Sequence, residues 1–337
     1  MPATKSLAPA GMRLSRRLTK LLTSQGALLL LLSLALFASF RYETFLTPLN
    51  LMNIMRQNSM LAIVALGMTV VILSGGIDLS LGALVALGGV VSAMLAGQGS
   101  LVAILGGIAS TTLLGVVNGL LVSRARLQPF VVTLFTASAA RGLALSITEE
   151  KSIAVSSATS GLVWLGRGFI GPVPVPVLVV ALLYFAAWFM LHKSRLGLHI
   201  FAVGDNEEAS RLMGVSPNRV KLAVYTISGL LSGLAGVVLA GRLGAGQPVA
   251  AFGWETDAIA AAVMGGTFLG GGQGSVFPTL VGVLLLGMMY NLLNLEGTIT
   301  PWWQLVIRGG FLLLVVIFQQ SVVKTRACLR TGLSGKR

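Results

Sequence analysis

Apolar residues run through this chain in long blocks that are separated by short polar breaks. A helix that crosses the hydrocarbon core of a bilayer needs about 20 mostly apolar residues. Two uncharged stretches, 79–123 and 258–295, are each long enough for two such helices and are divided by glycine-rich turns at 97–100 and 270–274. The pattern predicts about ten transmembrane helices, at 21–40, 57–74, 79–96, 100–122, 128–148, 173–191, 222–241, 257–270, 274–294 and 302–320.

Composition supports the same fold class, an all-α integral membrane protein. The 337 residues are 55% hydrophobic and 10% charged, whereas soluble domains are about 25% charged. We expect a basic N-terminal tail at 1–20, a polytopic domain at 21–320 and a basic C-terminal tail at 321–337. The net charge of +14 does not indicate a nucleic-acid partner, because the basic residues stand at the ends of apolar runs next to lipid.

The distribution of charge orients the predicted helices. Ten helices with a cytoplasmic N-terminus place most of the 24 basic residues in the cytoplasmic segments, chiefly 1–20, 192–221 and 321–337. An excess of Lys and Arg on that side is the rule for membrane proteins, so both termini are predicted to be cytoplasmic. Because the second set of five helices would start outside, related halves would form an inverted repeat of five plus five.

A hydrophilic island interrupts the second half of the chain at 202–221, within the predicted cytoplasmic loop 192–221. It contains Glu208-Ala209-Ser210, followed by Gly214 one helical turn later. The pattern predicts a short amphipathic helix on the cytoplasmic face, which is suited to contact a soluble partner.

A second polar break, Ser74 to Gly82, carries an isolated acid in an apolar region. Gly75 and Gly76 end one predicted helix, and Asp78 or Ser80 can cap the next by accepting hydrogen bonds from its free N–H groups. An acid at membrane depth is also a candidate for a direct role in transport. Both readings of Asp78 stay open at this stage.

Polar side chains inside the apolar runs need partners, because lipid offers none. They are candidates for a hydrophilic path, although interhelical hydrogen bonds would explain each one equally well. The candidates are Asn58, Thr69, Asn118, Thr133, Thr136, Asn291 and Asn294. Arg141 and Arg308 either snorkel to the outer surface or line the same path.

Several chemistries have no motif here. The chain lacks Gly-x-x-x-x-Gly-Lys-Ser/Thr, Gly-x-Ser-x-Gly and His-Glu-x-x-His, so neither nucleotide hydrolysis nor intramembrane proteolysis is indicated. His192 and His199 lack metal-ligand spacing. We expect no enzyme activity, metal or cofactor in this chain.

Three ordered motifs resemble the sugar permeases of ribose-type ATP-binding-cassette (ABC) importers, over about residues 50–320. They are Gly67 to Gly82, Ala202 to Ser216, and Gly265 to Ser275. Segments 149–153 and 296–303 look most like one permease subunit of galactofuranose importers.

The resemblance implies a permease subunit for a monosaccharide, pentose or hexose, in a bacterial inner membrane. Its implied partners are a second permease subunit, a periplasmic sugar-binding protein and a cytoplasmic ATPase that holds ATP and Mg²⁺. The segment from Glu208 to Gly214 is similar to the family's Glu-Ala-Ala-x-x-x-Gly coupling motif, with Ser210 in place of the second alanine. The implied coupling residues are Glu207, Glu208, Ala209, Arg211 and Gly214.

One other functional class remains open, an ion-coupled secondary transporter of small polar solutes. Such a protein needs no ATPase partner and usually carries buried acids or broken helices. The near absence of acids within the predicted membrane spans favours the ABC permease.

Overall fold

The computed structural model describes residues 10–155, 160–297, 300, 302–304, 306–307, 309–310 and 313, with side chains from residue 26 onward except at 160. Its helices are α1 Ala10–Arg41, α2 Pro48–Leu73, α3 Leu81–Met94, α4 Ser100–Ser123, α5 Pro129–Thr148, α6 Ser160–Arg167, α7 Val175–Lys193, α8 Arg195–Asp205, α9 Glu207–Leu212, α10 Pro217–Leu243, α11 Trp254–Met264 and α12 Val276–Glu296, with a 3₁₀ turn at Ala96–Gln98. Two-residue strands are β1 Ile153–Ala154, β2 Phe169–Ile170, β3 Val173–Pro174 and β4 Ala245–Gly246.

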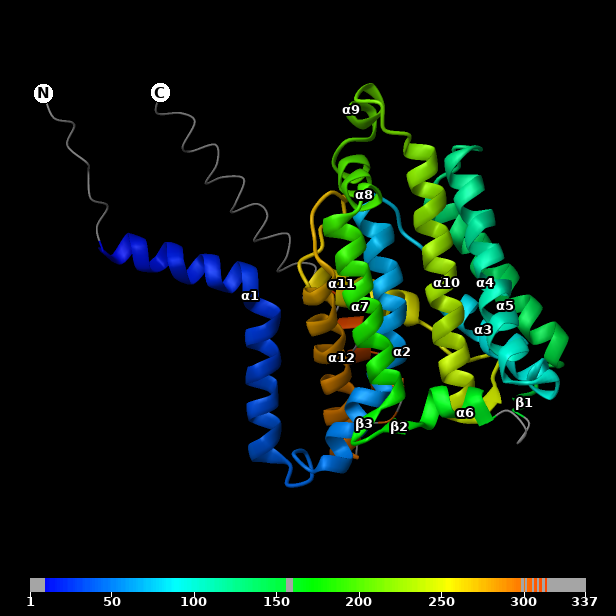
Figure 1. Ribbon diagram of the computed structural model, residues 1–337. Coiled ribbons are helices and arrows are strands. Elements are labelled where there is room, and N and C mark those ends of the chain that lie inside the picture. Colours follow the sequence, from blue (N-terminus) through cyan, green and yellow to red (C-terminus); the bar gives the residue numbers. More distant parts are fainter. Residues whose placement is uncertain are drawn as a thin grey trace, which may run out of the picture.

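The predicted all-α membrane fold is confirmed. Each of the first nine predicted spans contains a helix, whereas the tenth, 302–320, and Arg308 lie largely or wholly outside the described residues. Six described helices are long and apolar enough to cross a bilayer, namely α2, α4, α5, α7, α10 and α12. Their long axes run side by side through the bundle (Figure 1).

Two helices begin well before the residues that the hydrophobic pattern indicates. α1 is helical from Ala10, within the predicted tail 1–20. α2 begins at Pro48 rather than at 57, so Arg56 lies inside it. The side chain of Thr47 accepts the N–H of Asn50 at 3.3 Å, and Pro48 occupies the first helical position. This pairing of an N-cap with proline sets the start, although the first turns are polar.

Two predicted spans are too short to cross a membrane as helices. α3 has 14 residues and α11 has 11, instead of the predicted spans 79–96 and 257–270. A non-helical segment precedes each one, 74–80 before α3 and 244–253 before α11. Glycine within both segments, and Pro248 in the second, interrupt the helical hydrogen bonding.

α2 forms the centre of the bundle. Every residue from Asn58 to Leu73 is buried. The largest hydrophobic cluster joins these residues to buried positions of α7, α10, α11 and α12. α2 is therefore enclosed by protein rather than by lipid along most of its length.

Close packing of α10 explains its stripe of small residues. A Cβ atom added to Gly229 would lie 2.9 Å from the Cα atom of Gly115 on α4, and one added to Gly115 would lie 3.0 Å from the Cα atom of Gly229. Gly236 meets α3 in the same way, at 2.8 Å from the N atom of Gly89. Small residues let the helix backbones approach where lipid supplies no hydrophobic drive.

The two ends of the bundle differ. α8 and α9 project at one end, here called the α8–α9 end, whereas α6 and strands β1 to β3 lie at the other, the β1–β4 end (Figure 1). At the β1–β4 end, Ile153 pairs with Gly246 and Ala154 pairs with Ala245. Segment 244–253 therefore starts at this end and must return into the bundle to reach α11.

Candidate functional site

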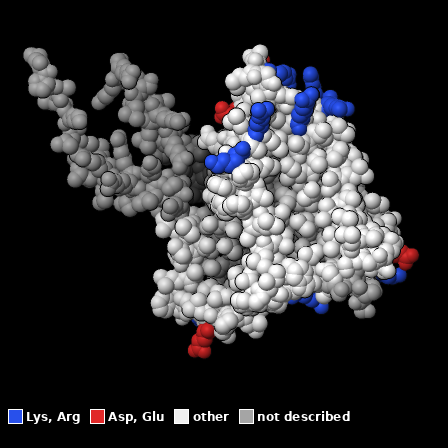
Figure 2. All heavy atoms as spheres, in the orientation of Figure 1, with Lys and Arg blue, Asp and Glu red and all other residues white. Residues whose placement is uncertain are grey.

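The α8–α9 end carries two short helices, α8 and α9, where the hydrophilic island predicts one. Ser194 caps α8 by accepting the N–H of Gly197 at 3.2 Å, and Asn206 caps α9 by accepting the N–H of Ala209 at 2.8 Å. Most of the visible Lys and Arg side chains gather over this end (Figure 2). The segment is thus a defined, charged projection.

Glu207 holds α9 against α10. Its Oε2 atom lies 2.6 Å from Nζ of Lys221 on α10, and its Oε1 atom lies 3.4 Å from Nη2 of Arg211. The Lys221 side chain is 21% exposed and that of Arg211 is 56% exposed. Because solvent weakens exposed ion pairs, the pair with Lys221 contributes more to the position of α9.

The tip of α9 presents apolar side chains. Leu212 and Met213 are 85% and 72% exposed, and neither was among the coupling residues expected from the sequence. Gly214 follows with φ of +84°, and no atom lies within 4 Å of the position of an added Cβ. Its left-handed backbone ends α9, and the open space beside it leaves room for a partner.

Three backbone segments meet beneath this projection, at Leu73 to Gly75, Gly204 and Gly271 to Gly272. The N–H of Gly272 donates to the carbonyl of Leu73 at 3.0 Å. A Cβ atom added to Gly204 would overlap that same carbonyl oxygen. We call this contact the glycine junction, because it joins the ends of α2 and α8 to the turn after α11 without intervening side chains.

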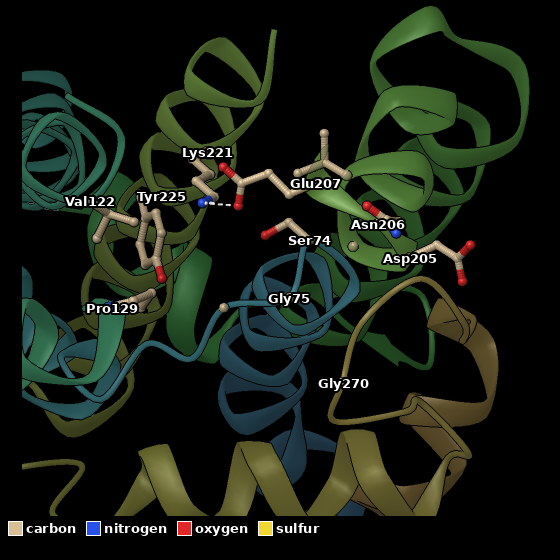
Figure 3. Close-up of a pocket in the computed structure, with 13 residues that line it drawn as sticks. Ser74, Gly75, Val122, Pro129, Asp205, Asn206, Glu207, Lys221, Tyr225 and Gly270 are labelled. Atoms are coloured by element: carbon tan, nitrogen blue, oxygen red, sulfur yellow. Dashed lines mark hydrogen bonds and ion pairs between the residues drawn. The ribbon is translucent and has the colours of Figure 1, made fainter. Parts of the chain in front are cut away.

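A cavity of about 300 Å³ opens next to the glycine junction. Polar groups on its wall come from Ser74, Asn206, Glu207, Lys221 and Tyr225. Figure 3 shows Lys221 and Glu207 reaching toward each other over the cavity, with Ser74 below them, whereas Asp205 points away. The phenol of Tyr225 donates to the carbonyl of Ile77 at 3.3 Å, next to Asp78.

Asp78 is fully buried and belongs to a chain of polar side chains. Its Oδ1 atom accepts from the N–H and hydroxyl of Ser80, at 2.9 and 2.5 Å, and Oδ2 accepts from the hydroxyl of Ser228 at 2.6 Å. Asn118 donates to Ser80 at 3.2 Å and accepts from Thr136 at 2.5 Å. The chain links α10, the break after α2, α4 and α5.

Neither Asp78 nor Ser80 forms the predicted side-chain cap of α3. Ser80 stands at the N-cap of α3, but its side chain caps no N–H group of the helix. Asp78 accepts the N–H of Ser80 itself, before the first turn, rather than a donor within the helix. The hydroxyl of Ser80 is directed instead toward the carboxylate, a strong acceptor. Gly75, with φ of +83°, follows α2 as expected of a helix break.

The other candidate path residues make hydrogen bonds within this chain. Thr69 pairs with Thr279 at 3.0 Å, and the amides of Asn291 and Asn50 bond reciprocally. Asn58 and Thr133 donate to carbonyls of their own helices, and Asn294 accepts from Gln304. The set therefore lies on several helix contacts rather than along one wall, and its role in a path stays a prediction.

Arg141, half-buried on α5, does not extend freely toward water. Its Nη1 atom donates to the carbonyls of Pro248 at 2.6 Å and Ala250 at 2.8 Å, within segment 244–253. In the part of the chain that the structure describes, no group of three or more His, Cys, Asp and Glu side chains could hold a metal ion.

Comparison with known proteins gives consistent matches. The family described as "Branched-chain amino acid transport system / permease component" matches residues 50–316. The ribose import permease protein RbsC of Escherichia coli K12 is 41% identical over 300 residues, covering 88% of this chain and 93% of that protein. The D-allose permease AlsC of the same strain is 38% identical over 299 residues, covering 88% and 91%. Its L-arabinose permease AraH is 33% identical over 303 residues, covering 89% and 92%. No solved structure matches this chain.

Proposed function

This chain belongs to the family of ribose-type sugar permeases of ABC importers, and we propose that α9 couples sugar movement through it to a separate ATPase. It is a multi-pass membrane protein of monosaccharide import. The observation that carries the coupling proposal is the tip of α9. Leu212 and Met213 are exposed there on a helix that an ion pair fixes to α10.

The partners and orientation follow from the same proposal. The α8–α9 end faces the cytoplasm, where basic residues collect, and the ATPase that holds ATP and Mg²⁺ docks there. A second permease subunit and a periplasmic sugar-binding protein complete the importer in a bacterial inner membrane. Both termini are cytoplasmic, which requires an even number of membrane crossings. The ten predicted spans meet this requirement when α3 and α11, each with its preceding non-helical segment, are counted as one crossing apiece.

An inverted repeat is supported by the order of elements. α2 runs toward the α8–α9 end and is followed by a non-helical segment and the short helix α3. α10 runs toward the β1–β4 end and is likewise followed by a non-helical segment and the short helix α11. The same sequence of elements in opposite directions is what an inverted repeat produces.

One observation supports the alternative of an ion-coupled transporter. Asp78 and Asp257 are buried, whereas the sequence predicted few acids at this depth. Both carboxylates accept hydrogen bonds from hydroxyl groups, from Ser228 and Tyr290 respectively. Family membership favours the ABC permease, and the test is whether the chain alone, reconstituted in vesicles, performs gradient-driven uptake.

The docking of α9 is tested with charged substitutions at its tip. Leu212→Glu and Met213→Glu leave this chain's own packing untouched because both side chains are exposed. In the reconstituted importer we expect both variants to assemble in the membrane but to lose sugar-stimulated ATP hydrolysis and uptake. Met213→Leu is the matched control and should behave like the unsubstituted protein. Normal uptake in both glutamate variants would exclude this docking site.

The transported sugar is identified by comparing uptake of the candidate sugars. Ribose, allose, arabinose and galactofuranose are presented to the complete importer, and uptake of each is measured. Galactofuranose remains the prediction from segments 149–153 and 296–303, whereas the named relatives are permeases for the first three sugars.

A further inference from the structure

Segment 246–251 runs through the bundle beside α3. At its start, a Cβ atom added to Gly246 would lie 2.7 Å from the carbonyl oxygen of Gly89 and 2.8 Å from Cβ of Ala93. At its end, the carbonyl oxygen of Ala251 lies 2.5 Å from the position of an added Cβ at Gly82. From Ala93 back to Gly82, α3 spans about 16.5 Å, which is slightly more than half of a hydrocarbon core of about 30 Å.

Val249 within this segment and Phe252 just after it are exposed at that depth, whereas Gly246, Pro248 and Ala251 are buried. Val249 is 63% exposed and Phe252 is 80% exposed. The N–H groups of Val249, Ala251 and Phe252 find no hydrogen-bond acceptor among the described residues. Lipid-exposed irregular backbone is not tolerated in the hydrocarbon core, because each unpaired polar group costs several kcal/mol there. Lipid therefore does not cover this face, which borders either water or the second permease subunit.

Neighbouring groups organise the same face. Arg141 satisfies the carbonyls on either side of Val249, which keeps the segment in place. Glu255, in the first turn of α11, interacts electrostatically with Arg141 and contacts Gly82. Ala251 holds a left-handed backbone, with φ of 54°, and strained residues of this kind persist where surrounding contacts fix them.

We propose that segment 247–253, which includes Phe252, forms the sugar-contacting wall of the translocation path together with Glu255. The proposal rests on the permease function and names the part of the chain that meets the sugar. Backbone N–H donors and a carboxylate acceptor match the hydroxyl groups of a monosaccharide, and the exposed ring of Phe252 matches its apolar C–H face. Arg141 is the positioning residue, because it acts through the carbonyls it binds.

Water access gives the decisive test. In the complete importer, with Cys328→Ser as background, Val249→Cys and Phe252→Cys are treated with a charged, membrane-impermeant methanethiosulfonate. The cysteine thiolate, which forms in water and not in lipid, attacks the reagent's thio sulfur, so that a mixed disulfide forms and methanesulfinate leaves. Leu113→Cys is the matched control, because Leu113 lies on the spanning helix α4 and is 65% exposed. We expect rapid modification at positions 249 and 252 and none at 113.

A second measurement separates sugar contact from simple wetting. Phe252→Ala should raise the KM for the transported sugar by up to about tenfold, as expected for the loss of one aromatic contact, while Phe252→Tyr keeps the KM. Failure of both thiols to react, or an unchanged KM in Phe252→Ala, would overturn the proposal. Uptake by the unsubstituted importer is measured first, so that loss of the permease function itself is recognised separately.

Discussion

Asp78 and Ser228 are joined by a 2.6 Å hydrogen bond between the carboxylate and the hydroxyl. The bond connects the break after α2 to the middle of α10, deep in the bundle. No described Lys or Arg lies within ion-pair distance of this carboxylate. Its stability in the interior therefore depends on hydroxyl and N–H donors.

The first prediction concerns this carboxylate. Asp78→Asn keeps an oxygen to accept from Ser80, and its amide can donate to Ser228, whose hydroxyl can reverse its role. Transport should remain close to normal. Asp78→Ala leaves buried donors without an acceptor and should lower the free energy of unfolding by about 2 kcal/mol. Thermal unfolding and uptake are measured for both variants. A folded Asn variant that does not transport would show that the charge itself is used.

The second prediction concerns the position of α9. Lys221→Met removes the more sheltered partner of Glu207, so α9 should move more freely and uptake per ATP hydrolysed should fall. Arg211→Met removes the exposed partner and should have little effect, because exposed pairs contribute less than about 1 kcal/mol. The ratio of sugar transported to ATP hydrolysed is the measurement. Equal effects in the two variants would contradict the ranking of the two ion pairs.

The third prediction concerns the glycine junction. Gly204→Ala places a methyl group on the carbonyl of Leu73 and should destabilise the protein by about 1–3 kcal/mol, as overpacking does. Gly142→Ala, on α5, meets no atom within 4 Å and should be neutral or slightly stabilising. Melting temperatures in detergent compare the two. A stable Gly204→Ala variant would mean that the three backbone segments separate readily.

The fourth prediction concerns orientation. With Cys328→Ser as background, Lys193→Cys at the α8–α9 end should be shielded from an impermeant thiol reagent applied outside the cell, while Thr44→Cys should react. Both positions are exposed, so burial does not decide the result. Ser123, at the end of α4, is not chosen for labelling because its side chain is buried. Reaction of Lys193→Cys from outside would reverse the proposed orientation.

Hydrophobic pattern predicted most helices because lipid selects for uniform apolar runs. It failed at α3 and α11, where apolar composition persists but Gly, Pro and packing against other helices make the backbone irregular. In the sequence, residues 247–253 look like the end of one span and the start of the next. Only their contacts with α3 show that the chain turns back into the membrane at this point. Sequence pattern carries no signal for such a return.

The candidate residues divide in the same way. Local signals worked for α9, because an N-cap asparagine, two acids and a following glycine act within a few residues. Pairings between distant positions, such as Lys221 with Glu207 and Arg141 with Pro248, could not be read from spacing. The exposure of Leu212 and Met213 could not be predicted, because exposed and buried apolar residues look alike in a sequence.

The brevity of α9 has a consequence for inhibitor design. It has 6 residues, and helices of that length are not stable alone in water because nucleation is costly. In the protein, the Asn206 cap and the anchor on α10 supply the missing order. A linear synthetic peptide copying 206–214 would lose conformational entropy when it binds, so it would compete only weakly with α9 for the docking site. A covalently cross-linked helical mimic would already hold the bound conformation.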